Sequence, residues 1–253
     1  MGLSKIDRRT LSDAVFDQLS REIVDGRMEP GALLPSEREL VQVLGVNRGA
    51  VREALKRLAQ SGLVQIQQGG GTRVLDYRQS AGLDLLGALM LRGDGEVDLR
   101  VARSVMEMRS ALARDVARLA AQRRDDAVVD TLRGLLQSME RTEDLGELQV
   151  LALDFWDALV EASDNVAYRL AFNTLRETYE LIRGALVIVM ADEVSDRAGH
   201  REVLQAVAAR EPDAAHQAAA SLVQRGTAKV FDLLDALAAE QDATHTTTEG
   251  ASS

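Results

Sequence analysis

The sequence predicts a mainly α-helical protein: an N-terminal winged helix-turn-helix (three helices plus a β-hairpin wing) followed by an antiparallel six- or seven-helix bundle. Three observations lead to this fold class. Two short helix patterns meet at a Gly-containing turn within residues 35–60, and an alternating segment with a glycine run follows them. Helical periodicity then dominates the chain after Leu75, where only one of the chain's three prolines falls.

The two short helices are delimited by their capping residues. Ser36 forms a capping box with Glu39, and Gly45 is placed to end the first helix in a left-handed conformation. Asn47 can cap the second helix almost at once. The second helix carries an apolar stripe and a separate basic stripe: Val51, Leu55 and Leu58 on one face, and Arg48, Arg52 and Lys56 on another. A helix with this basic face fits the major groove of B-DNA.

The remaining parts of a winged domain flank this pair. Residues 11–24 form an amphipathic pattern typical of a first helix that packs behind the other two, and residues 32–34 predict a short strand. Residues 63–67 alternate apolar and polar side chains as a half-buried strand does, and a glycine run turns the chain into residues 72–75. Glycines at such a wing tip allow the backbone to approach DNA closely.

The chain after the wing predicts a second, helical domain. The expected helices cover residues 80–91, 97–122, 126–141, 145–162, 166–190, 195–209 and 212–240, with Pro212 in the first turn of the last one. We therefore expect a DNA-binding domain with the start of a linker over 1–78 and an effector-binding and dimerisation domain over 79–240. The polar, Thr-rich residues 241–253 are expected to be disordered.

The distribution of charge supports this division. The whole chain has a net charge of −10, yet residues 1–78 hold 12 Lys and Arg against 10 Asp and Glu, net +2. Residues 79–253 hold 18 against 30, net −12, and the two values sum to −10. Between Arg38 and Arg57 five basic residues face two acidic ones, net +3. The acidic second part should therefore face away from DNA.

Composition excludes several other classes of protein. Without cysteine the chain has no disulfide, thiolate catalysis or Cys-ligated zinc. No signal peptide and no apolar run long enough for a membrane are evident, which predicts a cytoplasmic protein with no membrane partner. There is no GxSxG, no phosphate-binding loop and no His/Asp pair at reactive spacing, so we do not expect an enzyme.

Several motifs in the N-terminal part match a known family in order. The sequence resembles the DNA-binding domain of GntR-family bacterial transcriptional regulators, and the order of domains resembles the FadR branch of that family. The matching segments are Leu33–Leu40, Gly45–Arg48, Val51–Leu55, Leu58 and Gly62–Val64, and, more loosely, Glu107–Arg109, Leu119–Ala121, Phe155, Ala162–Asn165, His200–Leu204 and Asp213–Ala215. The resemblance implies a homodimer that binds near-palindromic operator DNA.

The resemblance also implies which residues touch the operator. Three arginines correspond by position to family arginines that contact bases or phosphates: Arg38, Arg48 and Arg52. The wing tip of the family carries a basic residue or His, whereas this chain has Gln68, which puts the strength and selectivity of the wing contact in doubt. The full set of expected DNA-binding residues is Arg38, Asn47, Arg48, Gly49, Arg52, Gln68 and Gly69.

The same comparison argues against a metal. Most members of the branch hold a divalent metal with one Asp and three His, but three of those positions are Ala152, Trp156 and Leu222 here, and only His200 remains. We therefore expect no metal site and no cofactor. Asp154 could replace the missing aspartate only by rotating far from the Ala152 face.

In lacking these metal ligands, the chain resembles the acyl-CoA-responsive regulators of the branch. Residues 80–86 resemble their linker and Arg109 occupies the place of a pocket arginine, although Gly226 and Val230 replace their Ser and Trp. The expected effector-binding residues are Arg109, Trp156 and His200, and the effector a fatty acyl-CoA or another apolar acid. Two alternatives stay open: a sensor of a small carboxylate, or a constitutive dimeric repressor with a vestigial pocket.

Overall fold

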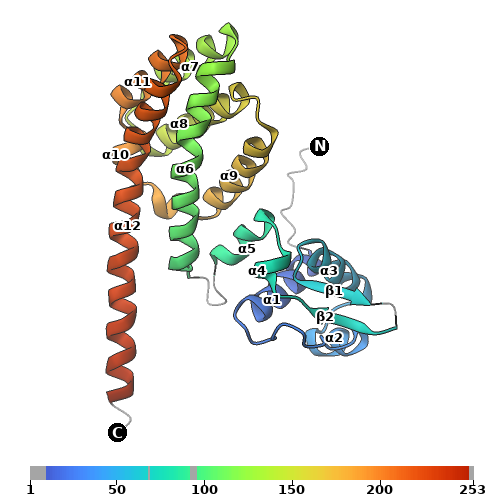
Figure 1. Cartoon of the computed structure of the whole chain (residues 1–253). Coiled ribbons are helices and arrows are strands. Elements are labelled where there is room, and N and C mark those ends of the chain that lie inside the picture. Colours follow the sequence, from blue (N-terminus) through green and yellow to red (C-terminus); the bar gives the residue numbers. More distant parts are fainter. Residues whose placement is uncertain (1–9, 68, 92–95, 251–253) are drawn as a thin grey trace, which may run out of the picture. The chain divides into compact units, whose positions relative to one another are not determined.

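The computed structural model describes residues 10–67, 69–91 and 96–250, and the chain divides into two compact units, Met1–Asp98 and Leu99–Ser253 (Figure 1). The fold class predicted from the sequence is confirmed, with a winged helix-turn-helix in the first unit and a helical bundle in the second. The first unit ends at Asp98 rather than at residue 78, because the intervening segment contributes the buried side chain of Leu85 to the first unit's core.

The first helix, α1 (Leu11–Val24), begins at a capping box. The Thr10 hydroxyl accepts a hydrogen bond from the backbone N–H of Asp13, and the Asp13 carboxylate accepts one from the backbone N–H of Thr10. Its apolar face enters a single core with the other elements of the unit. Members of this core include Val15, Leu19, Ile23, Leu34, Leu40, Val51, Leu55, Leu58, Leu63, Val64, Val74 and Leu85.

The helix-turn-helix consists of α2 (Glu37–Leu44) and α3 (Arg48–Gln60). Both predicted caps are present: Ser36 forms a capping box with Glu39, and Asn47 accepts a hydrogen bond from the Ala50 N–H at 2.9 Å. Gly45 ends α2 with φ +64°, the left-handed conformation that glycine adopts without steric cost. The turn is therefore short and fixed at both ends, which sets the direction of α3.

The wing is an antiparallel hairpin of β1 (Val64–Gln67) and β2 (Gly71–Val74), with Val64 opposite Val74. The predicted strand at residues 32–34 is confirmed as a short bridge along β2. The N–H of Leu34 donates to the carbonyl of Thr72, and Leu33 pairs with Arg73. This third segment ties the chain before α2 to the wing.

The segment after the wing differs from the single helix expected over residues 80–91. It contains α4 (Tyr77–Ser80), a 3-10 turn (Leu83–Leu85) and α5 (Leu86–Met90). Ala81 and Gly82 both adopt extended backbone conformations, which interrupts the helix before Leu83. The helix expected there is therefore wrong in its first part and right from Leu86 onward.

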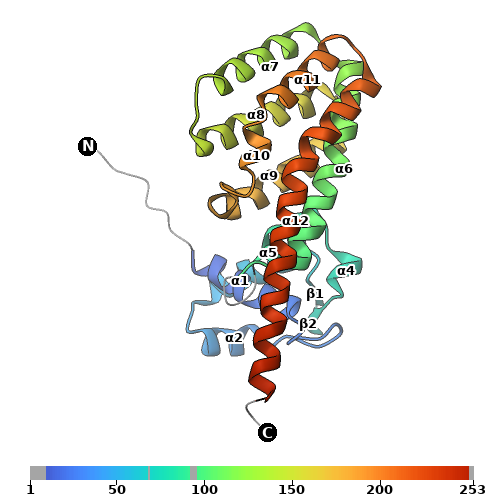
Figure 2. The ribbon, with the colours of Figure 1, turned by 90° about the vertical axis from the view of Figure 1, so that its left-hand side faces the viewer.

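The second unit is a bundle of α6 to α12, seven helices within the described part of the chain. Their bounds are α6 Leu99–Arg123, α7 Asp126–Met139, α8 Leu145–Ala162, α9 Val166–Leu186, α10 Ala191–Val194, α11 Arg197–Ala208 and α12 Pro212–Gly250. The long helices α6 and α12 run side by side (Figures 1 and 2). A buried hydrogen bond of 2.8 Å between the hydroxyls of Ser110 and Thr227 joins them.

Two expectations about the C-terminal helix have different outcomes. Pro212 opens α12 as predicted, since the first turn needs no donor from its nitrogen. The helix is assigned as far as Gly250, and the expected disorder of residues 241–253 stays a prediction. Residues 251–253 lie outside the described part. Over the residues that are described, no helix is both long and apolar enough to cross a lipid bilayer.

Candidate functional site

The recognition helix α3 presents two arginines on one exposed face. Arg48 lies in its first turn and Arg52 one turn later, and their side chains are 76 % and 63 % exposed. Glu37, at the start of α2, lies between them. Its Oε2 lies 3.3 Å from Nε of Arg48, and its Oε1 lies 3.8 Å from Nε of Arg52. One carboxylate from the first helix therefore aligns both guanidinium groups at the surface.

The other predicted DNA-binding residues surround this pair. Arg38 is exposed on α2, next to Glu37. Asn47 uses its side-chain oxygen to cap α3, and a Cβ on the exposed Gly49 would lie 3.2 Å from that oxygen. The cap satisfies the N–H of Ala50, whereas the first N–H groups of α3 lie at the exposed residues Arg48 and Gly49, where an anion such as a phosphate is favoured.

Of the two DNA-binding residues expected at the wing tip, the structure describes one. Gly69 is exposed at the tip with φ +75°, a conformation that favours glycine, whereas Gln68 lies outside the described residues. Arg73 on β2 donates a hydrogen bond from Nη1 to the carbonyl of Gly31. That arginine therefore holds the wing to the chain before α2.

One member of the basic cluster does not face solvent with the others. Arg57 is half-buried, its Nη1 lies 2.5 Å from a carboxylate oxygen of Asp13, and its guanidinium lies 4.4 Å from the ring centre of Phe16. Both partners belong to α1. Arg57 therefore holds α1 against α3. Although it belongs to the five basic residues counted between Arg38 and Arg57, its charge does not face DNA with the others.

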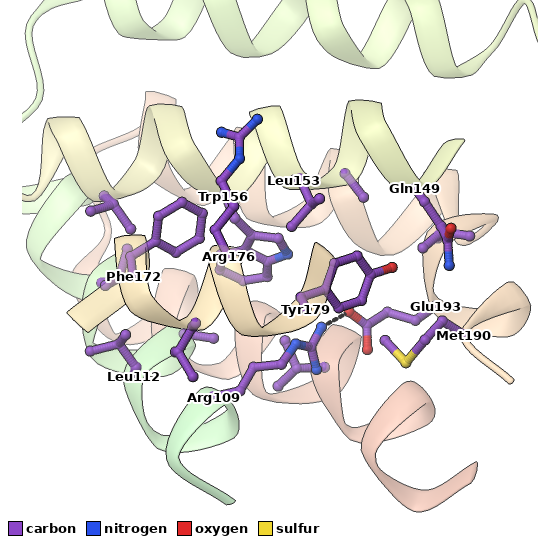
Figure 3. A pocket seen from close by; sticks show the side chains of 17 residues that line it. Arg109, Leu112, Gln149, Leu153, Trp156, Phe172, Arg176, Tyr179, Met190 and Glu193 are labelled. Carbon is purple, nitrogen blue, oxygen red and sulfur yellow. Dashed lines mark hydrogen bonds and ion pairs between the residues drawn. The ribbon is translucent and has the colours of Figure 1, made fainter. Parts of the chain in front are cut away.

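The second unit encloses a cavity of about 80 Å³ (Figure 3). Its walls come from α6, α8, α9, α10 and α12, with residues at helical spacing on each of the longer helices. Most of the lining is apolar: Leu112, Ala113, Val116, Ala152, Leu153, Trp156, Val160, Phe172, Leu175, Met190, Val194 and Val223. Its polar lining residues are Arg109, Gln149, Arg176, Tyr179 and Glu193.

A buried ion pair lies at the edge of this cavity. Nη2 of Arg109 donates to Oε1 of Glu193, whose side chain is only 4 % exposed (Figure 3). Burial raises the pKa of Glu193, and the nearby Arg109 opposes that shift. Removal from water also raises the pKa of the neighbouring Tyr179 to about 12. We take the pair as ionised together near neutral pH, because a protonated Glu193 would leave the buried guanidinium uncompensated.

Two neutral polar groups of the lining have no hydrogen-bond partner among the described residues. Gln149 is 1 % exposed, with both its amide nitrogen and its oxygen unpaired. Trp156 is 8 % exposed, and its indole N–H is unpaired as well. A buried polar group without a partner is costly, so unpaired atoms on a cavity wall indicate a place where a ligand can bond.

The structure brings together two of the three expected effector residues. Arg109 and Trp156 line the cavity, but His200 is absent from its lining. Nδ1 of His200 donates to the carbonyl of Asp196 at 2.9 Å, and its ring packs edge-on against Phe155 with 5.0 Å between centroids. Burial lowers the pKa of this histidine, which favours the neutral form. His200 is therefore a core residue.

The residues at the expected metal positions do not fit a metal. Ala152, Trp156 and Leu222 offer no carboxylate or imidazole, and the described residues contain no group of three or more His, Cys, Asp or Glu placed to hold one ion. Asp154 pairs instead with Arg176, its Oδ1 3.3 Å from Nη2. We therefore assign no role to a metal in this cavity.

Comparison with known proteins identifies both units. Residues 11–74 match the family described as bacterial regulatory proteins, gntR family, and residues 104–225 match the FCD domain. The HTH-type transcriptional regulator Mce2R of Mycobacterium tuberculosis is 38 % identical over 241 residues, which cover 95 % of this chain and 100 % of that protein. The chain belongs to the GntR family of bacterial transcriptional regulators. Its order of a winged helix-turn-helix before an FCD domain confirms the FadR-like arrangement.

More distant relatives agree with this assignment. The fatty acid metabolism regulator protein of Serratia proteamaculans is 29 % identical over 163 residues, or 64 % of this chain and 66 % of that protein. The solved structure of Lar, described as controlling expression of the Listeria monocytogenes agr system, superposes with a TM-score of 0.58 at 18 % identity. It covers 90 % of this chain and 99 % of Lar, and shows the shared fold alone.

Proposed function

We propose that this GntR-family regulator binds a near-palindromic operator as a homodimer, with one recognition helix in each half-site. The observation that carries the DNA contact is the exposed pair Arg48 and Arg52, aligned by Glu37 at the surface of α3. Paired arginines on a helix that enters the major groove can read guanine edges or bind phosphates. Arg38, the first N–H groups of α3 and the wing tip at Gly69 would add contacts to the DNA backbone.

The cavity of the second unit supports a sensor rather than a constitutive repressor. A vestigial pocket should be filled by side chains, whereas this space is open beside Arg109 and carries unpaired polar atoms. An effector that binds there would favour one separation of the two recognition helices, and operator affinity would change through that differential binding. Whether the outcome is repression or activation depends on where the operator lies in the promoter.

A fatty acyl-CoA or another apolar acid is the effector that the resemblance favours. The apolar walls and the relatives named as fatty acid metabolism regulators support this hypothesis. The cavity is about 80 Å³, however, which is smaller than the cavity of about 150 Å³ that binds benzene in another protein. An acyl chain would therefore require the helices to move apart, while a smaller molecule would not.

Selection of binding sites from a random duplex pool tests the DNA-binding part. Purified protein should enrich a near-palindromic sequence, and the mass of the complex should correspond to two chains on one duplex. A pool without an enriched sequence, or one chain on each duplex, would contradict this proposal.

Thermal unfolding with candidate ligands tests the sensor part. The panel contains long-chain acyl-CoA, free fatty acids, small dicarboxylates, and zinc or nickel with and without EDTA. A ligand of the folded state at one hundred times its Kd stabilises by about 2.7 kcal/mol. A shift with acyl-CoA supports lipid sensing, and an EDTA-reversible shift with metal contradicts the assignment of Ala152, Trp156 and Leu222.

A further inference from the structure

Each charged side chain that lines the cavity already has an oppositely charged partner. Arg109 pairs with Glu193, as described above. The guanidinium of Arg176 points away from that pair and lies 3.3 Å from Asp154 and 3.4 Å from Asp157 (Figure 3). Each arginine of the lining is therefore already paired with a carboxylate before an acid could bind.

The lining atoms without a hydrogen-bond partner among the described residues belong to two neutral side chains, Gln149 and Trp156, and to the ion pair, Nη1 of Arg109 and Oε2 of Glu193. Gln149 offers one acceptor and a two-proton donor, and Trp156 offers one donor. The two residues are seven positions apart on α8, which places them on the same face of the helix, toward the cavity. Nη1 of Arg109 is also without a partner among the described residues. A carbonyl oxygen can accept from any of these donors.

We propose that the effector of this cavity is an uncharged molecule with a small apolar body and an amide-type group, rather than a carboxylate. The amide group would exchange hydrogen bonds in both directions with Gln149, and a carbonyl oxygen would accept from Trp156 or Arg109. This inference rests on the proposed function, because it takes the cavity as the effector site.

A carboxylate fits this arrangement poorly for an electrostatic reason. To reach Arg109 it would share the guanidinium with Glu193, and two carboxylates would then lie close together in a site shielded from water. It would also meet the acceptor oxygen of Gln149 with no proton to offer. An amide has nearly the same size and shape and meets neither difficulty.

Trp156 makes a direct test practical, because it is the single tryptophan of the chain. Its indole N–H gives one NMR signal, which reports hydrogen bonding at the cavity wall in the full-length protein. We would titrate two pairs of matched size that are smaller than benzene, acetamide with acetate and propanamide with propionate. The amide of a pair should move the indole signal and bind about tenfold or more tighter than its acid.

Equal or tighter binding of the acids would overturn the inference and leave the cavity as an effector site. If neither member of either pair moves the signal, the inference is also overturned. The proposed function is then decided separately by operator selection and by the acyl-CoA arm of the unfolding experiment.

Three variants identify the groups responsible. Gln149→Leu should abolish the preference for the amide, whereas Gln137→Leu, at an exposed position on α7, should leave it unchanged. Glu193→Gln keeps the size of the side chain but frees the charge of Arg109, so it should shift the preference toward the acid. An unchanged amide preference in both Gln149→Leu and Glu193→Gln would overturn the assignment to these groups.

Discussion

At the scale of single residues, Glu37 has an effect beyond its own helix. Its carboxylate lies within ion-pair distance of both recognition arginines, which favours one orientation of their exposed side chains. Side chains that are already aligned lose less conformational entropy when they bind. On the operator, phosphates or guanine edges would compete with this single carboxylate for two guanidinium groups.

Replacement of either recognition arginine should weaken operator binding. We expect Arg48→Ala and Arg52→Ala each to cost about 1–3 kcal/mol of operator binding free energy, because each removes a contact to a base edge or phosphate. Fluorescence anisotropy at fixed salt measures this loss. Arg133→Ala is the matched control, since that exposed arginine lies on α7 of the second unit and pairs with Asp130. Unchanged affinity in both α3 variants would remove the assignment of the recognition helix.

Asp13 predicts a dependence of stability on pH. Hydrogen bonds from Thr10 and then from Arg57 lower the pKa of this half-buried carboxyl from 3.8 to about 2. The depressed pKa means that its contribution to stability is present above pH 3.8 and is lost as the pH falls through about 2. Wild type should therefore exceed Asp13→Asn in thermal stability near neutrality, and the gap should narrow on acidification across this window. A constant gap would contradict the linkage.

At the scale of elements, the local signals were sufficient for the DNA-binding unit. The capping box at Ser36, the left-handed Gly45 and the Asn47 cap each depend on residues within four positions of one another, so the sequence alone specifies them. The broken helix after Tyr77 was not predictable in the same way. Its apolar pattern is helical, but Leu85 packs into a core formed by elements far earlier in the chain.

The cavity shows the limit of sequence reasoning more clearly. Arg109 and Trp156 both line the cavity and lie on long, strongly periodic helices, and their role in effector binding stays a prediction. Glu193 was missed, since it lies 84 residues from Arg109 on a helix of four residues that has no periodic signal. Gln149 could have been found from its seven-residue spacing to Trp156, which shares its helix face. His200 was expected in the pocket by resemblance, and packing turned it toward Phe155.

The junction between α3 and the wing should be intolerant of a side chain. Gly62 has φ +71°, and a Cβ there would lie 2.4 Å from the carbonyl oxygen of Ser80. Gly62→Ala should therefore lower the free energy of unfolding by about 1–2 kcal/mol or more, measured by chemical denaturation. Gly134→Ala is the matched control on α7, where a Cβ meets nothing within 4 Å and should stabilise by up to about 1 kcal/mol. Equal effects of both variants would contradict this account.

At the scale of the whole molecule, charge is divided unevenly between the two parts of the chain. Residues 1–78 have a net charge of +2 and residues 79–253 a net charge of −12. Attraction to DNA is therefore concentrated on the N-terminal part, while the acidic remainder disfavours nonspecific contact of the bundle with phosphates. A molecule built this way can change operator affinity through its bundle without the bundle touching DNA.

If the two units communicate, the coupling must be the same in both directions. An effector that changes operator affinity by some factor must have its own affinity changed by that factor when operator is bound, because the four states form a closed thermodynamic cycle. We expect a factor of about 5–150. Calorimetric titration of the effector into free protein and into the protein–operator complex measures the change in effector affinity. Fluorescence anisotropy with and without effector measures the change in operator affinity. In Gln149→Leu, an amide effector should no longer change operator affinity, and operator should no longer change effector affinity. Operator affinity without effector should stay as in the wild type. Equal effector affinity for free and operator-bound protein would show that effector binding does not change operator affinity, as expected of a constitutive repressor.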